Sequence, residues 1–296
     1  MILNQQLKRK IEPYAFLTPT AIIITVLLII PIAMVISYSF LNNAVVTRNP
    51  EFVGLENYVT VLSDSEFWSA IVHTIIFVSI SVIGHLVIGM GFALLINSDY
   101  FDSTTKTIVR VIYFMPWIFT ASVVAVLWKL MLQPQGIVNY LLSMLNVATK
   151  DTQWLSLRSR ALLTVTVINI WSGYPFYMIS ILAGLQGIPG ELFESATIDG
   201  AGKWGLFVHI TIPQLKPILI SIALLDFVWT IQVFAVLWML TGGGPVNSTT
   251  TLSVYIYKKV FYGSEYAIAS TAAVIVLILC SVVAFVYARY QNSLKR

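Results

Sequence analysis

The sequence of 296 residues is 58% hydrophobic and only 10% charged, and its net charge is +4. A soluble domain carries about 25% charged residues, so this composition excludes a soluble protein and predicts an all-α protein that crosses a membrane several times. The basic residues are scattered over loops and chain ends, which does not indicate a nucleic-acid partner. The single cysteine, Cys280, excludes a framework of internal disulfides.

Six apolar segments are long enough to cross a bilayer, which takes about 20 helical residues. Their runs of Val and Ile are strand-like in composition, but the backbone of a spanning segment must satisfy its own hydrogen bonds, and this favours helices. Prolines inside or near the ends of the segments predict bends. The predicted spans are 14–40, 70–96, 108–132, 161–182, 218–240 and 267–288, within one membrane domain of residues 14–288.

The distribution of Lys and Arg predicts an N-terminus on the cytoplasmic side. Ten of these residues then lie in inner segments and seven in or near outer ones, as the positive-inside rule requires. The first span is predicted to be a retained anchor, because its apolar run is too long for a signal peptide and no Ala-x-Ala site follows. Residues 1–13 and 289–296 are then cytoplasmic tails, and the 187–213 loop also faces the cytoplasm.

That inner loop contains an unusual stretch, ESATIDGAGKWGLFVHITIP, which begins at Glu194. The pattern predicts a short helix over 191–198, a turn at Asp199-Gly200 and an amphipathic helix over 203–212 that ends at Pro213 and Pro217. The small residues around the turn leave little side-chain bulk. Two interpretations are open from the residues alone: a knob that docks into a groove of a partner, or an amphipathic segment lying on the membrane.

The stretch resembles the EAA loop of importer permeases of the ATP-binding-cassette superfamily, whose pattern is Glu-Ala-Ala, Asp-Gly-Ala and then Ile-x-Leu-Pro. The matching residues here are Glu194-Ser195-Ala196, Asp199-Gly200-Ala201 and Ile210-Thr211-Ile212-Pro213, with departures only at Ser195 and Ile212. Three further segments, FVGLENYVTVL, INIWSGYPFYM and LTGGGPVNSTTTLSVYIYKKVF, resemble carbohydrate permeases of the maltose type. The resemblance therefore covers nearly the whole chain.

The resemblance implies a six-helix permease that is not an enzyme. Its partners would be a second permease of similar fold, two ATPase subunits and an extracytoplasmic solute-binding protein, all at the plasma membrane of a bacterium or archaeon. No G-x-x-x-x-G-K-[ST] loop is present, so ATP and Mg are expected only on the partner ATPase, and the chain itself is expected to bind no cofactor or metal. The residues implied in ATPase coupling are Glu194, Ser195, Ala196, Asp199, Gly200, Ala201, Gly202 and Pro213.

Polar side chains inside spans mark a second candidate site, since such groups are costly in a membrane and often line a pathway. The resemblance to maltose-type permeases places sugar contacts on one stripe of span four and one of span five. For Asn169 the alternative is a hydrogen bond between helices, and for Asp226 it is a protonated structural acid or a pair with another subunit. The predicted path residues are Asn169, Ser172, Gly173, Phe176, Asp226, Trp229, Thr230 and Val233.

Other residues near these stripes receive structural interpretations. Trp171 and Tyr177 are predicted to face lipid or to pack, and His73, His85 and His209 do not have the spacing of metal ligands. No Lys or Arg lies centrally in a span, which favours a neutral sugar over a phosphate ester. The alternatives are a permease for glycerol-3-phosphate or another polyol, an intramembrane enzyme, and a proton-coupled carrier that uses Asp226.

Overall fold

The computed structural model describes residues 14, 16–42, 45–98, 100–147, 149 and 151–294, with side chains up to residue 289. Among these residues there are helices, turns and a single isolated bridge between Leu41 and Phe52, and no β-strand. The predicted all-α class is therefore confirmed. The chain divides into two compact units, one formed by Met1–Asp64 with Ile256–Ile278 and the other by Ser65–Tyr255 with Leu279–Arg296.

The first unit contains the N-terminal apolar helix, which runs over Phe16–Tyr38 and includes a π-helical turn, Thr25–Ile29, before α2 (Ile30–Tyr38). A short helix, α3 (Glu56–Ser63), follows. The buried Asn57 donates hydrogen bonds from Nδ2 to the carbonyl oxygens of Ser39, at 2.9 Å, and Leu41, at 3.0 Å. These bonds satisfy carbonyls beyond the end of α2, where the helix leaves its last acceptors unpaired.

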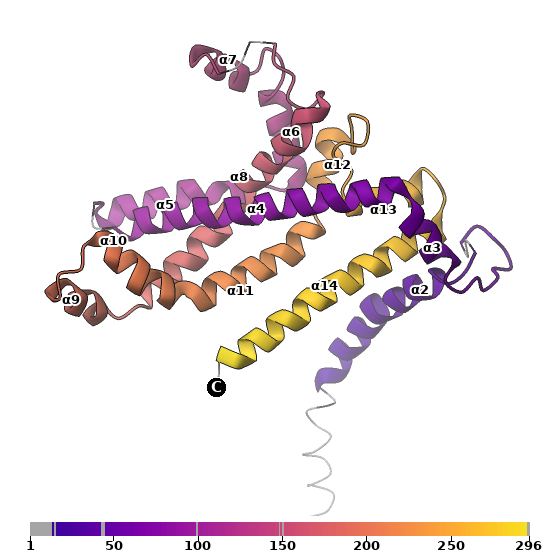
Figure 1. Ribbon diagram of the computed structural model, residues 1–296, viewed down its shortest axis with the longest axis horizontal. Coiled ribbons are helices and arrows are strands. Elements are labelled where there is room, and N and C mark those ends of the chain that lie inside the picture. The colour runs from indigo at the N-terminus through magenta and orange to yellow at the C-terminus, as the bar shows by residue number, and fades with distance from the viewer. Residues whose placement is uncertain are drawn as a thin grey trace, which may run out of the picture. The chain divides into compact units, whose positions relative to one another are not determined.

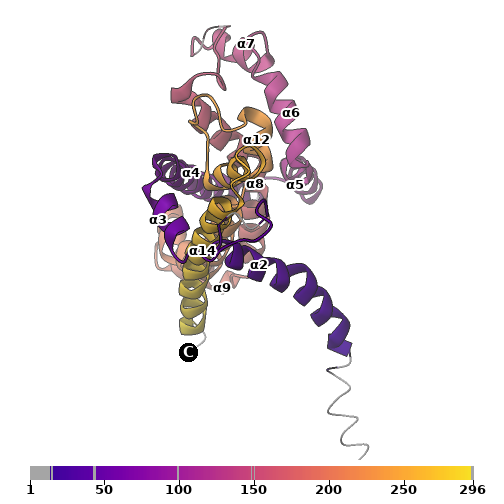
Figure 2. The same cartoon turned by 90° about the vertical axis from the view of Figure 1, so that its right-hand side faces the viewer.

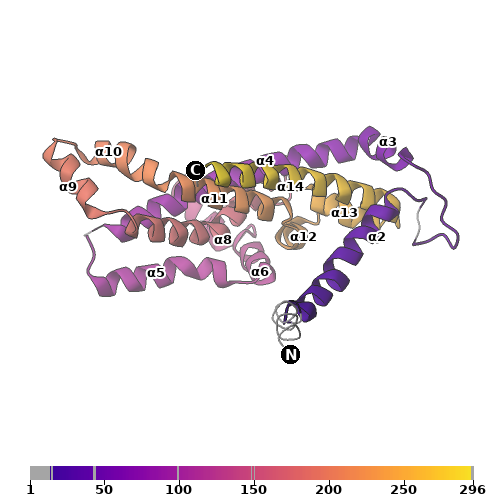
Figure 3. The ribbon, with the colours of Figure 1, turned by 90° about the horizontal axis from the view of Figure 1, so that it is seen from below.

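The core of the second unit is built on three helices, α4 (Ser65–Asn97), α8 (Arg158–Gln186) and α11 (Ile212–Ile231). Glycines let their backbones approach closely, as small residues do between membrane helices. A Cβ added at Gly89 of α4 would lie 2.5 Å from Cβ of Tyr177 and 2.9 Å from the backbone nitrogen of Met178, both on α8. Figures 1 and 3 show α5 (Ser103–Ile118) running along the same group of helices.

The third predicted span, 108–132, is not one continuous helix. It consists of α5 and α6 (Ala121–Met131), whose axes differ by 97°. Phe119 and Thr120 are extended, and Thr120 Oγ1 accepts a hydrogen bond from the backbone nitrogen of Val123, so a new helix starts there with its own cap. Figure 2 shows α6 leading from α5 to α7 (Ile137–Met144), which precedes α8 in the chain.

The fifth predicted span also differs from the structure. Lys203 to Ile231 form one helical run, made of α10 (Lys203–Leu206), a π-helical turn Phe207–Thr211 and α11. The prediction that Pro213 and Pro217 end a helix is therefore wrong. The backbone nitrogen of Ile212 donates five residues back, to Phe207 O, and this wider turn accommodates the proline that follows.

The run ends at Ile231, so the predicted span 218–240 is interrupted before a separate helix, α12 (Ala235–Thr241). The remaining helices are α13 (Leu252–Phe261) and α14 (Tyr266–Leu294). Five helical segments of the described chain are long and apolar enough to cross a membrane, and the bent pair α5–α6 gives a sixth if it counts as one span. Figure 1 shows α9 (Gly190–Ile198) and α10 beyond one end of α8 and α11, while α6, α7 and α12 lie toward the other.

Candidate functional site

The predicted coupling loop is a compact connection between α8 and α11. Only residues 187–189 separate α8 from α9, and only residues 199–202 separate α9 from α10. Pro189 stands at the N-cap of α9, and Glu191 lies in its first turn, where the helix dipole favours negative charge. The helix expected over 191–198 is therefore confirmed, with one extra residue at its start.

The turn after α9 is a Schellman motif. The backbone nitrogen of Ala201 donates to Ala196 O at 2.9 Å, and that of Gly200 donates to Thr197 O at 3.0 Å. This pair of bonds requires a left-handed residue at the position of Gly200, and Gly200 has φ +85°. Asp199 precedes it as the C-cap of α9. The Asp199-Gly200-Ala201 part of the predicted coupling loop thus has a specific backbone role.

The tip of the loop is accessible. Glu194, Ser195, Asp199, Gly200 and Gly202 are exposed, as is Pro213 at the start of α11, while Ala196 and Ala201 are half-buried against the motif. Added Cβ atoms at Gly200 and Gly202 would meet no atom within 4 Å.

Two large apolar side chains flank this small-residue turn. Ile198 is 87% exposed and Trp204 is 74% exposed. The sequence indicated the small surface and Trp204, but it gave no special place to Ile198. Exposed apolar groups of this size beside a turn of defined shape are typical of a contact surface.

The predicted path residues separate into one set held in buried contacts and a second, more accessible set. Asn169, Asp226 and Thr230 are buried, and Gly173 packs on the ring of His85, where an added Cβ would collide with that ring. Thr230 Oγ1 donates to Asp226 Oδ1 at 3.0 Å, and Asn169 Nδ2 donates to Ser81 Oγ at 3.0 Å.

Asp226 is the centre of a hydrogen-bonded group that the sequence did not reveal. Its Oδ2 atom lies 2.8 Å from His85 Nδ1 and accepts a hydrogen bond from the hydroxyl of Tyr177 at 3.0 Å. His85 Nε2 lies 3.1 Å from the carbonyl oxygen of Asn169. Tyr177 is fully buried, so it does not face lipid, and its packing role includes a polar contact. From the sequence, His85 has a structural interpretation and Asp226 is a predicted path residue, with no sign that the two meet.

The second set is more accessible: Trp229 is exposed, and Ser172, Phe176 and Val233 are half-buried. The ring centroids of Phe176 and Trp229 lie 5.3 Å apart, and Trp117 of α5 stacks on Phe176 at 6.4 Å. Trp229 is 49% exposed and Trp117 is 48% exposed. Three helices thus contribute to one aromatic surface, and Trp117 was not predicted to belong to it.

Ser172 and Val233 do not belong to the aromatic surface. Ser172 turns its hydroxyl to Asn169 O at 3.0 Å. Val233 lies after the end of α11, so it does not continue the helical stripe, and its carbonyl accepts a hydrogen bond from Ser253 at 2.8 Å.

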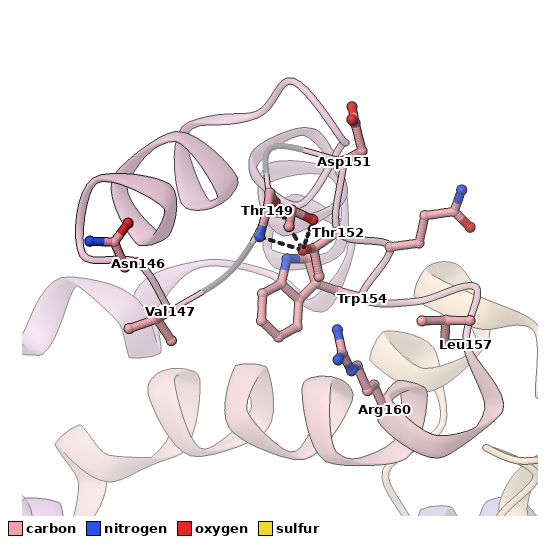
Figure 4. Close-up of a pocket in the computed structure, with 9 residues that line it drawn as sticks. Asn146, Val147, Thr149, Asp151, Thr152, Trp154, Leu157 and Arg160 are labelled. Carbon is pink, nitrogen blue, oxygen red and sulfur yellow. Dashed lines mark hydrogen bonds between the residues drawn. The ribbon is translucent and has the colours of Figure 1, made fainter.

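A cavity of about 810 Å³, lined by both polar and apolar side chains, lies between α7 and the start of α8. The indole nitrogen of Trp154 donates to Asn139 Oδ1, and Asn139 itself is fully buried and donates to three backbone carbonyls. The guanidinium carbon of Arg160 lies 5.8 Å from the centroid of the Trp154 ring. Figure 4 shows Arg160 directed toward this ring, with the bonded pair Thr149 and Thr152 on the far side of the indole. Within the described part of the chain, no group of three or more metal-ligating side chains occurs.

Comparisons with known proteins agree with this geometry. Residues 85–296 match the family described as binding-protein-dependent transport system inner membrane component. The trehalose/maltose transport system permease protein MalF of Thermococcus litoralis is 32% identical over 275 residues, covering 93% of this chain and 91% of the relative. The diacetylchitobiose uptake system permease protein DasB of Streptomyces coelicolor is 30% identical over 281 residues, which cover 93% of this chain and 85% of that relative. A crystal structure of a bacterial ABC transporter involved in import of the acidic polysaccharide alginate matches over all of both chains, with a TM-score of 0.84 and 25% identity.

Proposed function

This chain belongs to the family of inner membrane components of binding-protein-dependent transport systems, and we propose on that premise that its 187–213 loop couples a sugar pathway to a cytoplasmic ATPase. It is a permease subunit of a sugar ABC importer, a transport component and not a catalyst. Such permeases work with a second permease, ATPase subunits and an extracytoplasmic binding protein. ATP and Mg would bind to the ATPase and not to this chain, and both chain termini would lie in the cytoplasm.

The observation that carries the coupling proposal is the accessible Schellman turn at Gly200. A fixed turn with small residues and two exposed apolar side chains, Ile198 and Trp204, has the shape of a knob that fills a groove. A segment lying on the membrane would need an apolar face but no defined turn. The ATPase would bind this knob more tightly in one conformation of the permease than in the other, and that difference in affinity is what drives the change.

The aromatic surface of Trp117, Phe176 and Trp229 supports a sugar as the transported solute. Accessible aromatic faces stack on the apolar faces of sugar rings. Ser172 lies one helical turn before Phe176, and its hydroxyl now bonds to Asn169 O. We propose that the sugar passes along this accessible side, from the aromatic surface toward Val233 beyond the end of α11. The remaining predicted path residues, Asn169, Gly173, Asp226 and Thr230, lie behind it, and they would contact a sugar only after leaving their present contacts.

A neutral mono- or oligosaccharide is the proposed substrate. No Lys or Arg lies centrally in a predicted span, where it could bind a phosphate or a carboxylate. The experiment is uptake into liposomes that contain this chain with the permease and ATPase from neighbouring genes, supplied with their binding protein. ATP-dependent uptake of a neutral disaccharide is expected. Uptake of glycerol-3-phosphate or a polyol alone would show that the substrate class is wrong, and uptake without ATP that collapses with an uncoupler would show a carrier.

The cavity beside Trp154 is the proposed contact for the binding protein. It lies at the start of α8, whereas the coupling loop follows its end, so the two are on opposite sides of the membrane if α8 crosses it. Arg160 offers a guanidinium held near an aromatic ring, which suits a carboxylate on the binding protein. Arg160→Ala should reduce the stimulation of ATP hydrolysis by the binding protein, whereas Arg158→Ala, an exposed arginine outside the cavity, should leave it unchanged.

A further inference from the structure

The two helices that flank the coupling loop, α8 and α11, form its two arms. The loop joins them through short connections at residues 187–189 and 199–202. A displacement of α9 by an ATPase therefore acts on both arms at once. Whether it moves the permease as a whole depends on how firmly the arms are held to each other.

The first attachment between the arms lies close to the loop. A Cβ added at Gly184 of α8 would be 2.7 Å from side-chain atoms of both Leu215 and Ile218 on α11. Leu215 is fully buried in a cluster that includes Leu185. This contact is apolar and close-packed. One such contact allows the arms to pivot about it, because packing between smooth apolar surfaces is not directional.

The second attachment is polar and directional. Tyr177 of α8 donates its hydroxyl to Asp226 of α11, and His85 of α4 contacts the same carboxylate oxygen. His85 also reaches α8 through the carbonyl oxygen of Asn169. Asp226 is only 7% exposed, so water does not compete for these bonds. The set of His85, Tyr177 and Asp226 is called the clasp below.

The protons of the clasp follow from its acceptors. A carbonyl oxygen only accepts, so Nε2 of His85 carries a proton that it donates to Asn169 O. One further proton lies between His85 Nδ1 and Asp226 Oδ2. Whichever of the two atoms holds it, the pair has no net charge, which is the condition under which ionisable groups are tolerated inside a membrane. The pair therefore needs no counter-ion from the sugar or from another subunit.

We propose that the clasp makes α8 and α11 move as one body when the coupling loop is displaced, and that Asp226 is a positioning residue rather than a sugar ligand. Leu215 and Asp226 are eleven residues apart in α11, or about 16 Å along the helix axis at 1.5 Å per residue. The ring contact between Phe176 and Trp229 lies at the same end of α11 as the clasp and, like the packing at Leu215, it is apolar, so the clasp is the directional attachment that resists a pivot. This inference rests on the proposed function of the loop.

The test is the number of sugar molecules taken up per ATP hydrolysed by the reconstituted transporter. Tyr177→Phe removes one hydroxyl, and His85→Leu removes both contacts of the imidazole while keeping similar bulk. Each variant should keep ATP hydrolysis but lower uptake per ATP by about tenfold, the factor implied by the loss of one buried hydrogen bond of the clasp. The sugar concentration for half-maximal uptake should stay unchanged. His85→Asn, which retains a donor toward Asp226, should restore much of the ratio.

The matched control is Thr166→Val. Thr166 is a fully buried hydroxyl on α8 that bonds only within its own helix, to Leu162 O, so its loss should leave uptake per ATP unchanged.

Three results would overturn the clasp. The first is wild-type uptake per ATP in both Tyr177→Phe and His85→Leu. The second is an unchanged uptake per ATP with a raised half-saturation concentration of the sugar, as expected if these residues bind the sugar. The third is a loss of uptake per ATP in Thr166→Val as large as in the clasp variants. If the His85→Leu variant does not assemble with the other subunits, the uptake per ATP of Tyr177→Phe alone decides whether the clasp is correct. Failure of the wild-type complex to import any sugar with ATP would instead refute the proposed function, and the clasp with it.

Discussion

Replacement of Gly200 by Val and by Asn separates the shape of the coupling turn from its bulk. Gly200 has φ +85°, a conformation that glycine adopts freely and that is an outlier for a β-branched residue. Asparagine enters the left-handed region far more readily. An added Cβ meets no atom within 4 Å, so neither side chain collides with the rest of the chain. The two variants add similar volume but differ in how well they permit the turn.

The magnitude follows from the backbone. A left-handed conformation costs an ordinary residue about 1–2 kcal/mol, so valine lowers the ratio of the formed turn to other conformations by about 5- to 30-fold. An ATPase that binds only the formed turn loses apparent affinity by up to the same factor. Asparagine should lose much less. The helices α8 and α11 should be unaffected, because they pack on each other and not on the turn.

The assay measures how much ATPase remains with the purified permease complex, together with ATP-dependent uptake. We expect retention and uptake to fall in the order wild type, Gly200→Asn, Gly200→Val. Gly200→Asp, which adds a charge as well as bulk, should also impair uptake. Equal losses for Asn and Val would show that bulk matters and the left-handed turn does not. Normal uptake by the Val and Asp variants would refute the docking of this loop.

Three further predictions concern packing, capping and the aromatic surface. Gly89→Ala should lower the melting temperature, because its Cβ would lie 2.5 Å from Cβ of Tyr177 and overpacking costs about 1–3 kcal/mol; Gly91→Ala, with nothing within 4 Å, should not. Asp102 caps α5, and hydrogen bonds from Thr105 hold the pKa of its carboxyl below the ordinary 3.8. Because that pKa is lowered, the added stabilisation by the ionised carboxylate is present above pH 3.8 and fades as the pH falls further. Asp102→Ala should therefore lower the melting temperature at pH 7 and have a smaller effect once wild-type Asp102 is protonated. Trp229→Ala should raise the half-saturation concentration of the sugar without changing uptake per ATP, and Trp229→Phe should do so less.

The helical class and the number of apolar segments were predictable, because hydrocarbon offers no partner for free backbone groups. The turn at Gly200 was predictable as well, since the small residue after Asp199 is a local signal. The break at Thr120 was missed, although a Thr followed by a helix-forming run is a cap signal within an apolar sequence. Pro213 was expected to end a helix, but the helix continues through it. A proline ends a helix in water more reliably than it does next to a π-helical turn in a membrane protein.

The contacts of the predicted path residues could be predicted only in part, for a different reason. Asp226 and His85 are separated by 141 positions in sequence, and no local pattern connects them. The stripe on span four correctly grouped Asn169 and Gly173, but spacing along one helix cannot tell which neighbour covers it. The burial of Asp226 follows from how α4, α8 and α11 pack, which depends on glycines such as Gly89 and Gly184 at positions where any Cβ would collide.

The most direct test of the central claim is affinity purification of this chain after expression with the genes beside its own, followed by measurement of ATP hydrolysis. The account predicts that a second permease and an ATPase purify with it, and that the Gly200→Val variant loses the ATPase while keeping the second permease. A chain that purifies alone or with copies of itself, and that hydrolyses or requires no ATP, would contradict the assignment of the 187–213 loop as the coupling site.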